Sequence, residues 1–401
     1  MSEVAIGGSC APEFAAVRDE FERNFAERGE LGASLCLCHE GRKVVDLWGG
    51  HISAEGGEWQ EETLLVVFSC TKAASALCLH LLVAEGKIDP DAPLSAVWPE
   101  LRAGQMGGTL RMLLDHSLGL PAVRDPLPQD AMLRPELMEA RLSLEEPWWE
   151  PGTRQGYHAL TFGFLAGGLV RRLTGESLGS FFARRIAGPL GFEFYIGLPE
   201  ALEPRLAPIE AHRGSRSDPE TAFLRAAKTP GTATHAFVFN SGDWVSRRVN
   251  SREGHAAEIG AAGGVSNARG LAGMFEALTE GGHLIGLSRE QISAFATTTA
   301  ASHRDEVLQV PTRFGAGFMQ GMDNRAPARG GEGLIIGPRA FGHIGMGGSL
   351  GFSDPEAGLS FGYAMNRQGP GLFLNERGQA LVDATYRALG YRSSAAGFWQ
   401  R

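Results

Sequence analysis

Ser69 and Lys72 form a pair whose residue types and spacing could do chemistry. They make an S-x-x-K pattern in the stretch FSCTKAAS, where an apolar, strand-like run ends and a helix-like run begins. Residues three apart lie on one face of a helix. The serine could cap the helix by accepting a hydrogen bond from a free backbone N–H. It could instead be a nucleophile activated by the lysine, and the spacing alone leaves both interpretations open.

The surroundings of the pair favour the nucleophile. The positive end of a helix dipole stabilises negative charge developing on a serine Oγ. Lysine is scarce, with four residues in 401, and Lys72 has the apolar neighbours Phe68, Ala73 and Ala74. Desolvation among such neighbours would lower the pKa of the amine toward a value at which it accepts a proton. A capping serine needs no such lysine.

Acyl transfer through a serine also needs a second proton-handling group and an oxyanion hole. Tyr157, in PGTRQGYHA, follows a Pro-Gly turn and precedes a helical run, so it can project from a loop. The alternative is a tyrosine with a purely structural role. The stretch FGHIGMGGSLG is glycine-rich and strand-like. It predicts either an edge strand that a ligand can approach closely or an ordinary hairpin.

Taken together, these segments resemble the serine β-lactamase / penicillin-binding-protein superfamily, and most of all the family VIII carboxylesterases, which are close to class C β-lactamases. The stretches LLDHSLGLP, WEPGTRQGYHALTFGFL and SLGSFFARRIAGPLG add to a resemblance that runs from about residue 12 to 390. The matching positions are Ser69 and Lys72 for S-x-x-K, Tyr157-His158-Ala159 for Tyr-x-Asn, and His343-Ile344-Gly345 for the Lys-Thr-Gly strand in its H-x-G form.

The resemblance implies a role for each motif. Ser69 would be the acylated nucleophile. Lys72 and Tyr157 would share its proton, with Tyr157 the preferred base and later the activator of the hydrolytic water, although which of the two first deprotonates the serine stays open. The backbone N–H groups of Ser69 and Met346 would form the oxyanion hole. The substrate site would be lined by His343, Gly345, His158 and Trp149.

Two departures from the family pattern bear on the substrate. Ala159 replaces the asparagine of Tyr-x-Asn, which removes an amide contact to a β-lactam, and His343 replaces a lysine, so a permanent charge becomes a titratable one. Both changes favour neutral esters. We therefore predict a serine hydrolase that cleaves small carboxylic esters with short acyl chains through an acyl-serine, with weak β-lactam hydrolysis at most. The alternatives are a β-lactamase or D-Ala-D-Ala-type peptidase, an acyltransferase using the same serine, and a non-enzymatic binding module.

Three further patterns compete with this assignment. GGSLG at 347–351 has the form of the G-x-S-x-G nucleophile elbow, but no histidine follows His343, so Ser349 lacks a downstream partner. KTPG at 228–231 mimics Lys-Thr-Gly but has Pro230 in its third position, which is poor in a central strand. HAAE at 255–258 is a weak metal-ligand pattern, and the histidines form no H-x-H or H-x-x-x-H pair. We expect no metal and no cofactor.

Composition narrows the class of protein. A net charge of −9 without a block of basic residues argues against nucleic-acid binding and a polybasic membrane anchor. No apolar run approaches the roughly 18 residues of a spanning helix, and the first residues lack the regions of a signal peptide. Five cysteines without a C-x-x-C pair indicate buried, reduced thiols. We expect a cytoplasmic protein with a small-molecule ester as its partner, and the oligomeric state stays open.

The elements around these motifs predict how the chain is organised. Residues 11–28 form an amphipathic helix, and two alternating runs around HEGR at 39–42 form a hairpin. Residues 86–234 are mainly helical. HAFVFN at 235–240 and the glycine- and aromatic-rich segments after it are strand-like, and NARGLAGMFEALTEG and NERGQALVDATYRALG are helices. We predict an α+β fold, with an antiparallel sheet flanked by helices from residues 1–85 and 235–401, a mainly helical domain inserted at 86–234, and the active site in the cleft between them.

Overall fold

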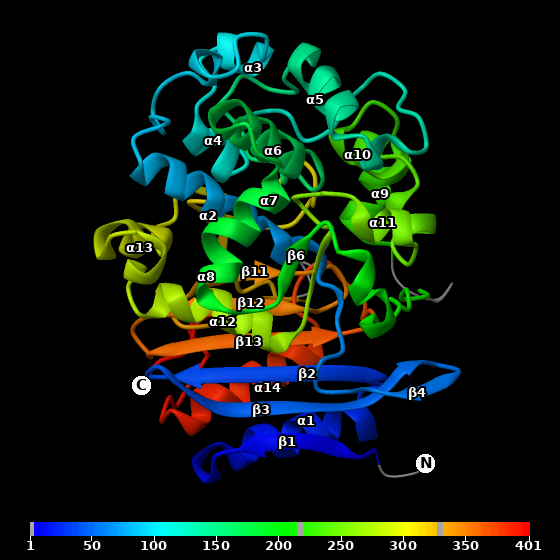
Figure 1. Ribbon diagram of the computed structural model, residues 1–401, viewed down its shortest axis with the longest axis vertical. Helices are drawn as coiled ribbons and strands as arrows, with labels where there is room; N and C mark the ends of the chain where they lie inside the picture. Colours follow the sequence, from blue (N-terminus) through cyan, green and yellow to red (C-terminus); the bar gives the residue numbers. More distant parts are fainter. Residues whose placement is uncertain (1–3, 215–219, 327–331) are drawn as a thin grey trace.

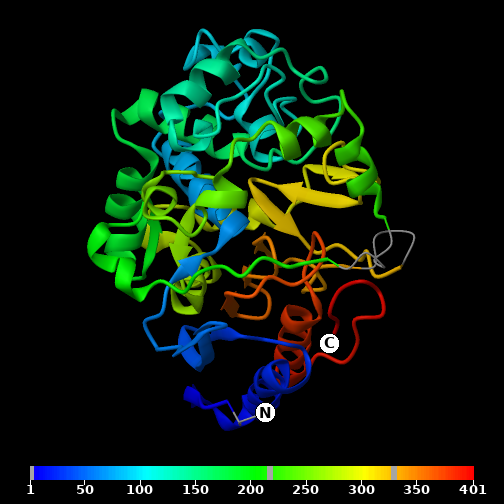
Figure 2. The same cartoon turned by 90° about the vertical axis from the view of Figure 1, so that its right-hand side faces the viewer.

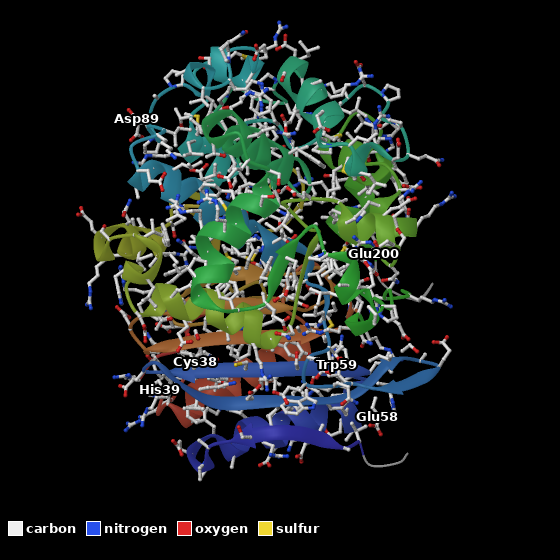
Figure 3. All side chains as sticks on the ribbon, viewed as in Figure 1. Cys38, His39, Glu58, Trp59, Asp89 and Glu200 are labelled. Carbon is white, nitrogen blue, oxygen red and sulfur yellow. The ribbon has the colours of Figure 1, made fainter. Side chains whose placement is uncertain are left out.

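The computed structural model describes residues 4–214, 220–326 and 332–401. In Figure 1 a large sheet occupies the lower part of the molecule, and a group of helices lies above it. Side chains fill the region between these two parts, as Figure 3 shows. Two large apolar clusters make up the core, one centred on the helices and the other between the sheet and the helices of the chain ends.

Strands from both ends of the chain build the large sheet. Its order is β1-β3-β2-β13-β12-β11-β10-β9-β8, with β4 paired to β3. The N-terminal hairpin joins the C-terminal strands where β13 runs antiparallel to β2, with Leu359 opposite His39 and Met365 opposite Ala33. The strands are β1 (Ile6–Cys10), β2 (Gly32–His39), β3 (Arg42–Ser53), β4 (Gly56–Glu58), β8 (Ala300–Ser302), β9 (Thr312–Gly315), β10 (Phe318–Gln320), β11 (Phe341–Ile344), β12 (Leu350–Asp354) and β13 (Leu359–Met365).

Helices cover the two faces of this sheet. On one face α1 (Ala15–Glu27) and α14 (Glu376–Ala388) pack together, visible as the blue and red helices low in Figure 2. On the other face α12 (Ala268–Thr279) packs against β12 and β13. Gly351 and Gly362 allow this approach, because a Cβ at Gly351 would lie 2.6 Å from the Phe275 ring and one at Gly362 would lie 2.1 Å from the carbonyl oxygen of Ala268.

The upper part is built around helix α2, whose side chains are mostly buried. A small second sheet, in the order β5-β7-β6, brings the strand before α2 against strands from distant parts of the chain. The elements are β5 (Leu65–Val66), β6 (Phe194–Ile196), β7 (Gly264–Ser266), α2 (Thr71–Ala84), α3 (Arg102–Gln105), α4 (Leu110–Leu114), α5 (Pro135–Leu144), α6 (Thr161–Thr174), α7 (Leu178–Phe182), α8 (Gly188–Leu190), α9 (Ala222–Lys228), α10 (Ala233–Phe239), α11 (Arg252–Ala256) and α13 (Arg289–Phe295).

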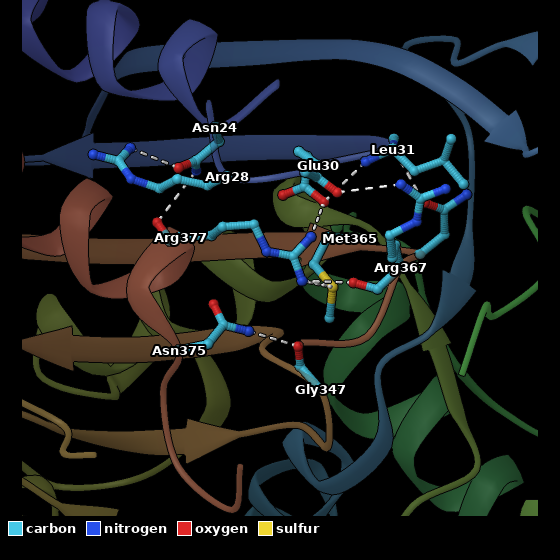
Figure 4. Close-up of polar contacts among 12 residues, drawn as sticks. Asn24, Arg28, Glu30, Leu31, Gly347, Met365, Arg367, Asn375 and Arg377 are labelled. Atoms are coloured by element: carbon cyan, nitrogen blue, oxygen red, sulfur yellow. Dashed lines mark hydrogen bonds and ion pairs between the residues drawn. The ribbon is translucent and has the colours of Figure 1, made fainter. Parts of the chain in front are cut away.

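A buried polar network ties the two ends of the chain together on the face of the sheet that α1 and α14 cover (Figure 4). Arg377, in the first turn of α14, donates to Glu30 Oε1 at 2.6 Å and to the carbonyl oxygen of Arg367 at 2.7 Å. Nearby, the side chain of Asn375 donates to the carbonyl oxygen of Gly347 at 2.8 Å. Because Gly347 belongs to the turn after β11, the start of α14 supports that turn.

The α+β class agrees with the prediction from sequence, and helices α1, α12 and α14 lie within the three segments predicted to be helical. The hairpin that turns at Glu40 and Gly41 also agrees. The strand predicted at 235–240 is wrong. This segment is helix α10, whose first turn is capped by the Thr232 side chain accepting from the backbone N–H of His235. The domain limits at 85/86 and 234/235 stay a prediction. Within the described residues, no helix combines the length and apolar character needed to cross a membrane.

Candidate active site

Ser69 lies in a strained turn between β5 and α2. The residues Phe68–Cys70 form a single 3-10 turn, and Phe68 has a φ of +46°, a left-handed conformation that is costly for a bulky residue. The Thr71 hydroxyl braces the turn by donating to the carbonyl oxygen of Phe68 at 2.5 Å and accepting from the N–H of Gly264 at 2.8 Å. The turn leaves Ser69 partly exposed among fully buried neighbours.

The serine does not cap the helix. Helix α2 begins at Thr71, its N-cap position is Cys70, and no side chain makes a capping hydrogen bond there. The capping interpretation of Ser69 is therefore wrong, and its hydroxyl is free for other partners.

Lys72 places its amine beside the serine. Its Nζ lies 3.3 Å from Ser69 Oγ, 2.7 Å from the carbonyl oxygen of Ala159 and 2.9 Å from that of Ala261. The side chain is fully buried, and desolvation holds its pKa well below the usual value. None of the described salt bridges involves Lys72, so no carboxylate opposes this effect.

Tyr157 is the second group in contact with the serine. Its side chain interacts with Ser69, and the Lys72 amine lies 4.6 Å from the centroid of its ring. Burial raises the pKa of Tyr157 above its usual value, although the interaction with Ser69 lowers it in part. The structure therefore brings together the three residues that the sequence motifs singled out.

Three buried histidines surround this group, and all are held neutral. Burial lowers the pKa of His158 and of His343 to about 3 and lowers that of His116 as well. His343 Nδ1 donates to the carbonyl oxygen of Ile344 at 2.8 Å, which makes Nε2 an acceptor. That Nε2 has no hydrogen-bond partner in the described part of the chain.

His158 and Trp149 hold loops in place. His158 donates from Nδ1 to the carbonyl oxygen of Gly156 at 2.8 Å and accepts at Nε2 from the N–H of Leu120 at 3.0 Å, so both ring nitrogens are engaged. Trp149 donates to the carbonyl oxygen of Ser117 at 3.0 Å, and its ring covers Gly156. A role for either residue in lining the substrate site stays a prediction.

Strand β11 lies directly against the serine turn. A Cβ at Gly345 would come within 2.3 Å of the carbonyl oxygen of Val67, so only glycine fits this approach. The Cys70 thiol donates to the carbonyl oxygen of His343 at 3.3 Å and links the same two segments. Met346 follows in the turn, with an exposed side chain. The predicted oxyanion-hole residues thus lie on the two segments that meet here.

Two supporting residues were not found from the sequence. His116 has a φ of +67° and accepts at Nδ1 from the N–H of His158 at 3.2 Å. Both carboxylate oxygens of Asp305 accept from the N–H of Tyr157, at 3.0 and 3.1 Å. His116 lies in the stretch LLDHSLGLP, which was noted only for its resemblance, whereas no spacing or motif marks Asp305.

The competing motifs do not assemble a site. Ser349 is fully buried, and its Oγ has no hydrogen-bond partner among the residues described. His255 contacts Glu203, whereas Glu258 binds the hydroxyl of Ser177. Lys228 ends helix α9 on the surface. In residues 4–214, 220–326 and 332–401, no cluster of three or more histidine, cysteine or acidic side chains could hold a metal ion.

Comparisons with known proteins agree with this geometry. Residues 18–385 match the family model described as Beta-lactamase. The chain is 34% identical over 378 residues to the esterase/beta-lactamase LipL of Mycobacterium tuberculosis, covering 90% of this chain and 83% of the relative. The crystal structure of a family VIII carboxylesterase superposes with a TM-score of 0.83 at 35% identity, over 96% of this chain and 100% of that one. A penicillin-binding-protein homologue from Caulobacter crescentus gives 0.80 at 34% identity, again over 96% and 100%. The resemblance predicted from sequence is confirmed, and the chain belongs to the beta-lactamase family.

Proposed function

We propose that this protein is a serine hydrolase that cleaves small carboxylic esters with short acyl chains through an acyl-serine at Ser69. The observation that carries the proposal is the buried Lys72 amine, which lies 3.3 Å from Ser69 Oγ and whose pKa desolvation holds well below its usual value. Relatives named as an esterase/beta-lactamase and a family VIII carboxylesterase support the reaction class.

The neighbours of Lys72 favour it as the acceptor of the serine proton. A neutral amine has two N–H bonds and one lone pair. The carbonyl oxygens of Ala159 and Ala261 can only accept, so they take both N–H bonds and leave the lone pair for the Ser69 hydroxyl. The raised pKa of Tyr157 keeps its hydroxyl protonated in the free enzyme. This assignment reverses the preference for Tyr157 as the first base.

The steps then follow from these protonation states. Ser69 Oγ attacks the ester carbonyl carbon as its proton moves to Lys72 Nζ, and the backbone N–H groups of Ser69 and Met346 stabilise the resulting oxyanion. As the intermediate collapses, Tyr157 donates its proton to the leaving alkoxide and recovers one from the Lys72 ammonium. In the second half a water molecule attacks the acyl carbon as its proton moves to Lys72 or Tyr157. The bond from the acyl carbon to Oγ then breaks, Ser69 Oγ takes up that proton, and the carboxylic acid leaves.

The charge of the site favours a neutral substrate. His343 is buried and uncharged and presents an acceptor nitrogen where the family pattern has a lysine. Such a nitrogen offers no attraction to the carboxylate of a β-lactam or of a peptide terminus. Ala159 supplies no side-chain amide either. We therefore expect neutral esters to be turned over much faster than cephalosporins.

The test is a hydrolysis panel on wild type, Ser69→Ala and Ser349→Ala. The panel covers p-nitrophenyl esters from acetyl to octanoyl and one chromogenic cephalosporin. Ser69→Ala should abolish turnover, whereas Ser349→Ala, the matched change in the G-x-S-x-G motif, should keep it. Mass spectrometry should find the acyl group on Ser69. Ester turnover retained by Ser69→Ala overturns the mechanism, and equal turnover of cephalosporin and ester overturns the substrate preference.

The same experiments separate the remaining alternatives. An acyltransferase would pass the acyl group to an added alcohol in preference to water, and the product analysis would reveal the new ester. A binding module would form no acyl adduct. The cytoplasmic location predicted from the sequence stays part of this proposal, and fractionation of cells that produce the protein would test it.

A further inference from the structure

Asp305 is a buried carboxylate whose partners converge on the loop that carries Tyr157. The side chain has no exposed surface. Oδ1 accepts from the N–H groups of Tyr157, Val307 and Leu308 at 3.0, 2.8 and 2.9 Å. Oδ2 accepts from Tyr157 again at 3.1 Å and from the Thr312 hydroxyl at 3.3 Å.

No cation balances this carboxylate, because none of the salt bridges in the described residues includes Asp305. Desolvation raises its pKa to about 6, while the surrounding N–H and hydroxyl donors lower it in part. Burying a charge without a counter-ion is costly. A serine or asparagine could cap a loop with less cost, so the arrangement calls for a reason beyond folding the loop.

The loop around Tyr157 has no regular structure of its own. Residues 154–158 belong to no helix or strand. The N–H of Gly156 donates to the carbonyl oxygen of His116 at 3.1 Å, and that of His158 donates to His116 Nδ1 at 3.2 Å. Between these two bonds, the N–H of Tyr157 itself is held by Asp305.

The segment after Asp305 also holds the tyrosine ring. Phe314, in β9, stacks on the ring of Tyr157 with centroids 5.7 Å apart and an angle of 17° between the planes. Thr312, which donates to Asp305, opens the same strand. Backbone and ring of Tyr157 are therefore both fixed by residues 305–314, which lie about 150 positions further along the chain.

We propose that Asp305 is a positioning residue that fixes the backbone of Tyr157 so that the tyrosine hydroxyl meets Ser69. The inference rests on the proposed function, because it gives Asp305 a catalytic effect only through Tyr157. If the backbone of Tyr157 rotates, the hydroxyl at the far end of the side chain moves by a larger distance than the backbone itself. A misplacement of about 1 Å in a catalytic group can reduce the rate by about 100-fold.

A double-mutant cycle in activity tests the proposal. Asp305→Asn keeps the size of the side chain but replaces one acceptor oxygen with an N–H₂ group that faces N–H donors. It should lower kcat for a p-nitrophenyl ester by about 10- to 100-fold and change KM by less than about twofold. In a Tyr157→Phe background, Asp305→Asn should cause no further loss, because the hydroxyl that it positions is already absent.

Asp354→Asn is the matched control. Asp354 is also a fully buried carboxylate, and it accepts from the Tyr386 hydroxyl at 2.6 Å and from the N–H groups of Glu356 and Ala357 at 3.2 Å. None of these partners belongs to the candidate site. This variant should lose thermal stability as Asp305→Asn does and still keep its kcat. If Asp305→Asn does not fold, Thr312→Val, which removes one donor to the carboxylate, should lower kcat in the same direction by less.

The outcomes separate the two proposals. If Tyr157→Phe is fully active, the proposed role of Tyr157 fails. If Tyr157→Phe is impaired while Asp305→Asn and Thr312→Val are fully active, only the positioning role fails. Independent, multiplying losses from Asp305→Asn and Tyr157→Phe would also overturn it, and so would an equal loss of kcat in Asp354→Asn.

Discussion

Replacing Lys72 with methionine should make the stability difference between wild type and variant depend on pH. The folded chain holds this amine in a buried site that lowers its pKa well below the usual 10.5, whereas the unfolded chain exposes it to water. Between the folded and the unfolded pKa, unfolding takes up one proton. The stability of the wild type therefore falls as the pH drops and rises with pH by about 1.4 kcal/mol per unit.

The variant lacks this dependence, and the titration of all other groups cancels in the difference. Methionine also leaves the carbonyl oxygens of Ala159 and Ala261 without the donor that reaches them at 2.7 and 2.9 Å. Each unpaired carbonyl costs about 1–3 kcal/mol. The free energy of unfolding of the wild type should therefore exceed that of Lys72→Met by several kcal/mol at high pH, and this difference should shrink steadily as the pH is lowered.

Urea unfolding followed by tryptophan fluorescence, in half-unit steps from pH 7 to 9.5, measures the difference. Lys87→Met, at an exposed lysine, is the control for replacing a lysine by methionine. If the stability difference between wild type and Lys72→Met does not change with pH, the folded protein keeps a charged ammonium at Lys72. The role of Lys72 as first proton acceptor would then be refuted. Ester hydrolysis by Lys72→Met should fall by about 10²- to 10⁴-fold.

Three further changes test the geometry around the serine. Thr71→Val removes the hydroxyl that braces the strained Phe68, and we expect a loss of about 1–3 kcal/mol in urea unfolding together with lower kcat. Gly345→Ala places a Cβ 2.3 Å from the carbonyl oxygen of Val67, so it should lower the free energy of unfolding by about 1–3 kcal/mol. It should also reduce kcat/KM, because β11 must move away from the serine turn. For Asp305, whose pKa is raised from 3.8 to about 6, the folded state holds the proton more tightly. The free energy of unfolding of wild type, relative to that of Asp305→Asn, should therefore fall by about 3 kcal/mol as the pH rises from about 4 to 6. This change has the opposite sign to the one expected for Lys72.

Elements with a strong pattern were predictable from the sequence. The amphipathic helices and the hairpin at Glu40 and Gly41 follow from local periodicity and turn residues, and both appear where expected. The helix α10 was missed because its apolar run HAFVFN also suits a strand. The signal that could have found it is Thr232, a capping residue directly before the run. Short apolar runs are ambiguous without such a cap.

The sequence by itself determined the pairing of Ser69 with Lys72, because residues three apart at a helix start share a face whatever surrounds them. The resemblance to the family motifs also singled out Tyr157 and the glycine strand. Only the tertiary structure decided the protonation states. The carbonyl oxygens that bind Lys72 come from positions 87 and 189 residues away, and the carboxylate that holds Tyr157 comes from 148 residues away. Burial and hydrogen-bond partners set a pKa, and no local pattern in the sequence records contacts over such separations.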